Sequence, residues 1–232
     1  MPNYLAIDAS TEACSVALQF NNTTTSAFEL CPQSHSLVLL PMVDSLLKAA
    51  NCQLSQLDGL VFGRGPGSFT GVRIGVGVAQ GLAFSAELPV VGVSTLQAMA
   101  QQAYEKHQQR EVIATIDARM SEIYAGFYRA NEDGVMMPVV DENVLAPQKL
   151  AEYLSEHTNC AYGVGTGWDA YQAELDGLKI NQASPEILFP NALSMLSIAN
   201  PMFENGLAVD AENAQPVYVR DTVSWKKLPG RA

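Results

Sequence analysis

The tripeptide Ile-Asp-Ala occurs twice in this chain, each time at the end of a strand-like run, and this repeat limits the possible folds more than any other feature. Ile7-Asp8-Ala9 and Ile116-Asp117-Ala118 each end an apolar strand-like run, and each is followed by a polar turn and a second strand-like run. Each copy therefore stands at the start of one half of the chain. We interpret the chain as a diverged internal duplication with two subdomains, residues 1–107 and residues 108–232.

The first half reads as the element order βββαβαβα. The expected elements are strands 4–8, 14–20 and 25–30, helix 35–50, strand 60–63, helix 70–85, strand 90–93 and helix 94–107. The second half offers strands 112–117 and 122–128, helix 147–156, strand 160–164 and helix 191–200. The predicted fold class is α/β, with a truncated second half whose C-terminal helix packs back on the first.

Composition excludes several classes of protein. The chain has 232 residues, 48% of them apolar and 16% charged, against roughly 25% charged in average soluble domains. Its net charge of −11 opposes binding to nucleic acid phosphates, so we expect tRNA contact only through partners. Neither a secretory signal nor an apolar run of membrane-spanning length is present. Four scattered cysteines without a C-x-x-C pair fit reduced thiols in the cytoplasm.

A glycine-rich segment, Gly63 to Gly75, joins a strand to helix 70–85. Such a junction can bind phosphate through free helix N–H groups, but this one matches neither the P-loop nor the G-x-G-x-x-G spacing. A structural turn is the alternative. In the helix itself, Gly71, Gly75, Ala79 and Ala83 recur every four residues and form a smooth stripe. The stripe fits close packing on the protein's own sheet or a helix-to-helix contact with a second chain.

Chemistry-bearing residues are few. Asp8, Ser10 and Thr11 form a strand-end turn that could contact a magnesium-bound phosphate or nucleotide, although simple turn and capping roles explain the same residues. The three histidines lie far apart with no H-x-x-x-H pattern, so no metal site is predicted. Ser68 does not sit in a G-x-S-x-G elbow. No catalytic residue is therefore assigned.

Five segments together resemble the bacterial TsaB family, also called YeaZ: Leu5–Thr11, Gly63–Gly75, Gly92–Leu96, Asp117–Arg119 and Pro216–Arg220. The resemblance implies an actin-like fold of the sugar kinase, Hsp70 and actin superfamily. It also implies a role in the synthesis of threonylcarbamoyladenosine at position 37 of tRNA. In that family the protein is a non-catalytic accessory subunit that binds the catalytic paralogue TsaD together with TsaE, and forms a homodimer when alone.

The resemblance further implies which residues correspond to the metal ligands of TsaD and which would form a partner interface. TsaD is expected to place two metal-binding histidines where this chain has Thr95 and Met99, and neither side chain replaces imidazole as a ligand. An interface is implied on helices 35–50 and 70–85. The residues expected there are His35, Leu39, Val43, Val72, Gly75, Val76 and Ala79.

Other functions stay open at this point. No cofactor is assigned to the chain itself, although ATP or ADP with Mg²⁺ at the interface of the complex is compatible with the family. The alternatives are a nucleotide-binding enzyme of the actin-like superfamily, a glycoprotease-like peptidase and a purely structural homodimer.

Overall fold

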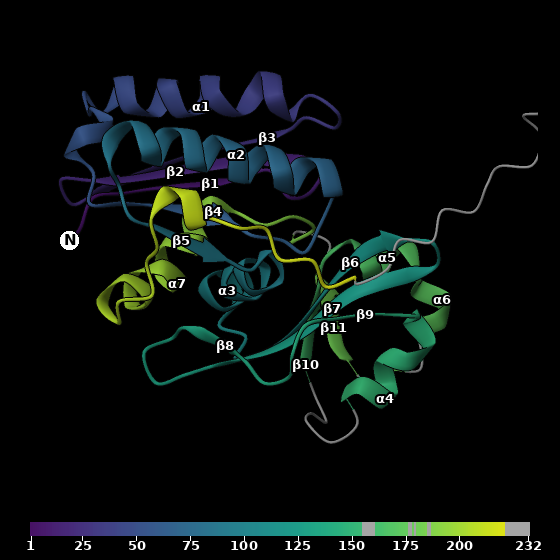
Figure 1. Cartoon of the computed structure of the whole chain (residues 1–232). Helices are drawn as coiled ribbons and strands as arrows, with labels where there is room; N and C mark the ends of the chain where they lie inside the picture. The colour runs from purple at the N-terminus through teal and green to yellow at the C-terminus, as the bar shows by residue number, and fades with distance from the viewer. Residues whose placement is uncertain (155–160, 176–177, 179, 185–186, 221–232) are drawn as a thin grey trace, which may run out of the picture.

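The computed structural model describes residues 1–154, 161–175, 178, 180–184 and 187–220. Two lobes, each built on one β-sheet, make up the molecule, and helix α3 (Thr95–His107) lies between them (Figure 1). Among the described residues, no helix combines the length and the apolar character needed to cross a membrane.

The first lobe contains a five-stranded sheet in the order β3-β2-β1-β4-β5. Its strands are β1 (Tyr4–Asp8), β2 (Ala13–Phe20), β3 (Thr23–Leu30), β4 (Gly59–Gly63) and β5 (Val90–Val93). Strands β1 to β3 form an antiparallel meander, and β4 and β5 continue parallel to β1. Because β1 is central and covered on both faces, all five of its residues are buried.

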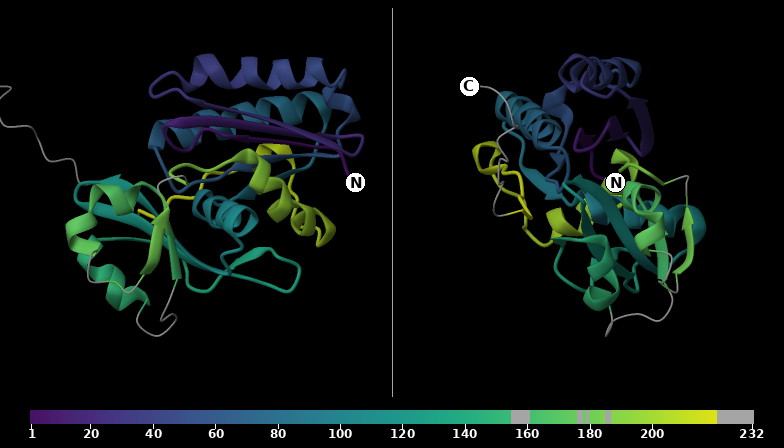
Figure 2. Two further views of the ribbon diagram at one scale, coloured as in Figure 1. Left: turned by 180° about the vertical axis from the view of Figure 1, so that it is seen from behind. Right: turned by 90° about the vertical axis from the view of Figure 1, so that its right-hand side faces the viewer.

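Helices cover both faces of this sheet. The helices α1 (His35–Ala49) and α2 (Phe69–Ala86) lie side by side on one face, and α7 (Ala192–Glu204) covers the other (Figures 1 and 2). No element in the described part of the chain lies outside α1 and α2, which form the outermost layer of this lobe. Short 3₁₀ helices at Leu54–Gln56 and Ala211–Asn213 complete the lobe.

The second sheet repeats the order of the first when strands are matched along the chain. Its order is β11-β10-β6-β7-β8, and β9 also pairs with β7. Its strands are β6 (Glu111–Arg119), β7 (Glu122–Ala130), β8 (Met136–Pro138), β9 (Asn143–Leu145), β10 (Ala161–Val164) and β11 (Ile180–Ser184). The duplication inferred from the two Ile-Asp-Ala steps is thus visible as two sheets of equal topology, with Asp8 ending β1 and Asp117 near the end of β6.

Within the described residues, the second half differs from the first mainly in the length of its helices. Every strand of the first sheet has a counterpart in the second, including β8 and β11, which the sequence did not reveal, and β9 is an additional strand that was also not predicted. The second-half helices α4 (Leu150–Leu154), α5 (Thr166–Ala170) and α6 (Gln172–Leu175) have four or five residues, against 15 and 18 in α1 and α2. A 3₁₀ helix at Pro147–Lys149 precedes α4, so the predicted helix 147–156 is interrupted; residues 155 and 156 lie outside the described part.

The last helix of each half packs on the other half. Helix α3 follows β5 yet contacts β6, β7, β8 and β10, and α7 follows β11 yet contacts β1, β2 and β5. The two helices also touch, and Ser194 and Ser197 of α7 both donate hydrogen bonds to the Glu105 carboxylate of α3, at 2.6 and 2.7 Å. This duplicated βββαβαβα arrangement is the actin-like fold, as predicted.

Candidate functional site

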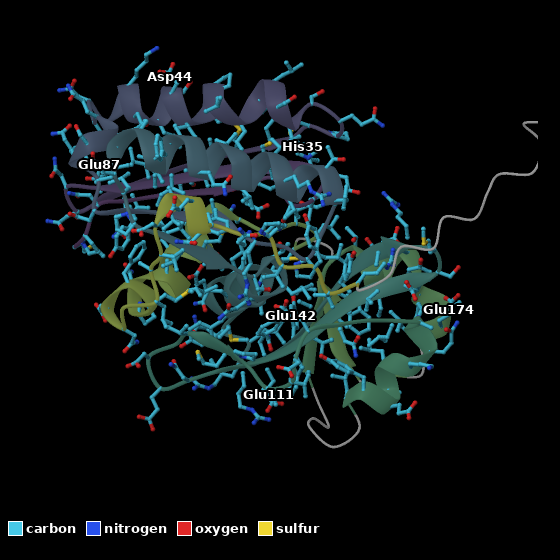
Figure 3. The ribbon with its side chains drawn as sticks, in the orientation of Figure 1. His35, Asp44, Glu87, Glu111, Glu142 and Glu174 are labelled. Atoms are coloured by element: carbon cyan, nitrogen blue, oxygen red, sulfur yellow. The ribbon has the colours of Figure 1, made fainter. Side chains whose placement is uncertain are left out.

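The seven side chains expected at a partner interface all lie inside the first lobe. His35, Leu39 and Val43 of α1 and Val72, Gly75, Val76 and Ala79 of α2 are buried. Figure 3 shows His35 on the side of α1 that faces the sheet, whereas Asp44 lies on the opposite side. His35 Nε2 is 2.6 Å from the Thr11 carbonyl oxygen, which makes this histidine a link between α1 and the turn after β1. All seven residues are covered by the chain's own packing in this structure, and their assignment as partner contacts stays a prediction.

The glycine stripe of α2 explains why these residues are buried. A Cβ atom at Gly71 would lie 2.3 Å from the Ala9 carbonyl oxygen, and a Cβ at Gly75 would be 3.6 Å from the Ala9 nitrogen. Ala79 and Ala83, which continue the stripe, are also fully buried. The stripe thus lets α2 approach the turn after β1, so of the two explanations left open by the sequence, packing on the protein's own sheet is the one found.

The opposite sides of α1 and α2 form a face that we call the outer face. Large apolar side chains on it are exposed, with Leu37 at 76%, Leu40 at 46% and Phe84 at 77%. Gly77 and Gly81 of α2 lie on this side too, and a Cβ atom at either position would meet nothing within 4 Å. A surface that is apolar and carries small residues allows another helix to approach closely.

The turn that follows β1 is closed to ligands. Asp8, Ser10 and Thr11 are only 1%, 0% and 3% exposed. Asp8 Oδ1 accepts hydrogen bonds from the Ser10 N–H and Oγ, both at 3.0 Å, and Ser10 Oγ accepts another from Thr95 Oγ1 at 2.9 Å. A Cβ at Gly67 would sit 2.1 Å from the Ser10 carbonyl oxygen, so the glycine-rich segment packs directly on the turn. In this conformation the three residues are covered by the chain itself, and their contact with a nucleotide stays a prediction.

Burial also changes the acidity of Asp8. Loss of water around the carboxyl group raises the pKa of Asp8 to about 6, although the hydrogen bonds from Ser10 and the nearby His35 oppose the rise. The carboxyl group is therefore held near its ionisation point around neutral pH, in a place with no solvent access. Ionisation of such a group changes the free energy of unfolding.

Asp117, the counterpart of Asp8 in the second lobe, has different surroundings. Its Oδ1 accepts from the Arg119 N–H at 2.9 Å and the Tyr171 hydroxyl at 3.1 Å, and its Oδ2 pairs with Arg119 Nη1 at 2.8 Å. Arg119 also reaches Glu12 of the first lobe, at 3.2 Å. The carboxylate thus orients an arginine that connects the two lobes.

The positions equivalent to the expected metal ligands of TsaD are packed inside the chain. Thr95 is 1% exposed and donates to Ser10, and Met99 is fully buried in the core formed by α3 and the second sheet. Within the described residues, no three His, Cys, Asp or Glu side chains are grouped as a metal site would require. Both positions therefore serve the packing of α3.

One segment near the C-terminus was missed as a functional element, and we call residues 214–220 the strap. The Val217 N–H donates to the Arg64 carbonyl oxygen at 2.8 Å, and Gln80 Nε2 donates to that of Ala214 at 2.9 Å. At its end, Arg220 donates to the Ala118 carbonyl oxygen at 3.1 Å and pairs with Glu122 at 2.5 Å. The strap thus runs from α2 to the β6–β7 turn, where Arg220 is its last described residue. Residues 221–232 lie outside the described part.

Comparisons with known proteins agree with this architecture. The family model of TsaD, tRNA N6-adenosine threonylcarbamoyltransferase, matches residues 27–223. The tRNA threonylcarbamoyladenosine biosynthesis protein TsaB of Escherichia coli K12 is 48% identical, covering 98% of both chains. TsaB of Haemophilus influenzae is 44% identical over 98% of this chain and 97% of its own. A crystal structure from Pseudomonas aeruginosa, described as similar to peptidase YEAZ, superposes with a TM-score of 0.88 at 43% identity, covering 95% of this chain and all of the other.

Proposed function

We propose a function on the premise that this chain belongs to the TsaB family of tRNA threonylcarbamoyladenosine biosynthesis proteins, within the wider TsaD family. It is the accessory subunit that binds and activates the catalytic TsaD paralogue in the cytoplasm, together with TsaE. The chain itself transfers no group and holds no cofactor. tRNA meets it only within the complex, and without TsaD two copies associate through the same surface.

One observation supports this proposal above the others, namely the outer face of α1 and α2. A protein that exposes Leu37 and Phe84 by about three quarters, beside two glycines flush with the helix surface, offers the apolar contact that protein partners use. Meanwhile the turn that would hold a nucleotide in an actin-like enzyme is filled by the chain's own glycine-rich segment. Binding a partner is thus better supported than nucleotide chemistry.

The partner surface can be tested by two substitutions on α2. Phe84→Glu and Gly77→Glu should each weaken binding to TsaD on the order of 100-fold, because each places a charge in a contact that excludes water. Phe84 is 77% exposed and a Cβ atom at Gly77 would meet nothing within 4 Å, so the thermal midpoint should stay within a few degrees of the wild-type value. Isothermal titration calorimetry with purified TsaD measures the affinity.

A matched control is available on the other side of the sheet. Leu193 of α7 is also an exposed apolar residue, at 43%, but it does not belong to the outer face. Leu193→Glu should therefore bind TsaD with wild-type affinity. Equal loss in all three variants would indicate a general charge effect, and no loss in any of them would place the interface elsewhere.

The activity itself is tested by threonylcarbamoyl incorporation into tRNA. TsaD and TsaE are incubated with ATP, threonine, bicarbonate and TsaC, which in this family makes the threonylcarbamoyl adenylate, with and without this protein. We expect incorporation to require the chain and the chain alone to show no turnover. ATP hydrolysis by the chain alone, lost on Asp8→Ala, would instead support the nucleotide-dependent enzyme; incorporation that is the same without the chain would contradict the proposed role.

A further inference from the structure

An arginine in the first turns of α2 contacts two aromatic rings. The Arg73 guanidinium carbon lies 3.2 Å from the ring centre of Phe69 and 5.0 Å from that of Tyr218, and the two rings are 6.1 Å apart. Phe69 is 61% exposed and Tyr218 46% exposed, so the group lies at the surface. We call these three residues the arginine clamp. Stacking restricts the rotamers of Arg73 while leaving the N–H groups in the plane of the guanidinium open to a ligand.

The strap holds Tyr218 in this position from both sides. Before it, the Val217 N–H is bonded to the Arg64 carbonyl oxygen, and after it, Arg220 is fixed on the β6–β7 turn. The Gly65 backbone has φ +95, and a Cβ there would lie 3.0 Å from the Val217 carbonyl oxygen, so the strap packs closely on the glycine-rich segment. Residues more than 140 positions apart in sequence thus build the clamp together.

The charge of Arg73 is not used within the described part of the chain. Arg119, Arg129 and Arg220 each pair with a carboxylate, at 2.8, 2.8 and 2.5 Å. Arg73 has no hydrogen-bond or ion-pair partner among the described residues, although acidic residues outnumber basic ones 24 to 13. An ordered and uncompensated cation in an acidic protein is suited to an anionic group brought by another molecule.

Arg73 also belongs to the outer face. Arg73, Gly77, Gly81 and Phe84 follow one another at spacings of four, four and three residues, which places them along one side of α2, and all four are exposed. The clamp is therefore continuous with the surface that we assign to the partner. A chain with net charge −11 repels a polyanion such as RNA, so a single carboxylate on a protein surface is the fitting ligand.

We propose that the arginine clamp receives an Asp or Glu carboxylate of the TsaD subunit that docks on the outer face. This inference rests on the proposed function and adds to it the chemistry that fixes the register of the two chains. The guanidinium supplies two parallel N–H donors to the carboxylate, and the strap keeps it oriented before the partner arrives.

The test is the affinity of the full chain for TsaD at low and high salt. Arg73→Gln should weaken binding about 10-fold and reduce its salt dependence, and Arg73→Glu should weaken it about 100-fold through repulsion of the carboxylate. Tyr218→Phe should bind as the wild type does, whereas Tyr218→Ala should lose part of the affinity because Arg73 is no longer held. Arg110→Glu serves as the control, since Arg110 is an exposed arginine outside the outer face that donates to the backbone of Ala130 and Asn131 and lies 6.0 Å from the ring centre of Tyr104.

Each result separates this inference from the proposed function. If Gly77→Glu abolishes binding while Arg73→Gln and Arg73→Glu bind normally, the partner surface stands and the carboxylate clamp is overturned. If the wild-type chain does not bind TsaD at all, the proposed function fails first. If Arg73→Gln instead removes ATP binding to the isolated chain and leaves the TsaD affinity unchanged, the ligand is a phosphate and the proposal is wrong.

Discussion

Gly71→Ala is expected to lower the free energy of unfolding by about 3 kcal/mol or more, the largest effect of any single methyl group added to α2. The new Cβ would lie 2.3 Å from the Ala9 carbonyl oxygen, and because that neighbour is backbone it cannot move aside by changing rotamer. Either α2 or the turn after β1 must shift, and both are part of the same core. Chemical denaturation followed by circular dichroism measures the loss.

Gly77→Ala on the same helix is expected to raise the free energy of unfolding instead of lowering it. No atom lies within 4 Å of a Cβ at that position, so the substitution keeps all contacts and gains about 1 kcal/mol from the higher helix propensity of alanine. Together, Gly71→Ala and Gly77→Ala test which side of α2 faces the sheet, and the test needs no partner protein. Destabilisation by both substitutions, or by neither, would contradict the assignment of an inner and an outer side.

Asp8→Asn is expected to stabilise the protein at pH 7 and not at pH 4. Burial raises the pKa of Asp8 from 3.8 in the unfolded chain to about 6 in the folded one, so the folded state prefers the protonated carboxyl group. The contribution of Asp8 to stability is therefore complete below pH 3.8 and is lost as the pH rises through 6. A shift of this size corresponds to about 3 kcal/mol in all, most of which is lost between pH 4 and pH 7.

Asparagine is neutral at both pH values and can keep the bonding pattern of the turn. Its Oδ1 can accept from the Ser10 N–H, and its Nδ2 can donate to Ser10 Oγ, which lies 3.0 Å from both carboxylate oxygens in the wild type. The difference in unfolding free energy between variant and wild type, measured by urea titration from pH 4 to pH 7, should rise with pH. Asp117→Asn, which removes the pair with Arg119 at the counterpart position of the second lobe, is titrated in the same way as a reference substitution. If the difference in unfolding free energy between Asp8→Asn and the wild type does not change with pH, ionisation of the buried carboxyl group does not destabilise the folded state.

The sequence predicted the first half of the fold closely because its elements are long and regular. Helices 35–50 and 70–85 differ from α1 and α2 by one residue at most at either end. The second half was harder because β8 and β9 have three residues each and α4 to α6 fewer than two turns, too short for a period to show. The repeated Ile-Asp-Ala step, rather than periodicity, carried the prediction of two similar halves.

The partner side of α2 could not be predicted from the same pattern. Val72 and Val76 on the inner side and Phe69 and Phe84 on the outer side are all apolar, so hydrophobicity marks two faces of one helix. The glycines were equally ambiguous, since Gly71 is required by the approach of Ala9 whereas Gly77 has open space around it. Only the position of the sheet shows which side of α2 is buried and which is exposed. The clamp on Arg73 depends in turn on Tyr218, which no local pattern connects to α2.

The position of α7 has a consequence for the order in which the protein is made. On the face of the first sheet opposite α1 and α2, Tyr4, Val61 and Val91 are buried by a helix that begins only at residue 192. A ribosome has therefore translated more than four fifths of the chain before the cover for the first strands exists. Until then the nascent first half exposes an apolar sheet face, so we expect it to bind chaperones near the ribosomal exit tunnel.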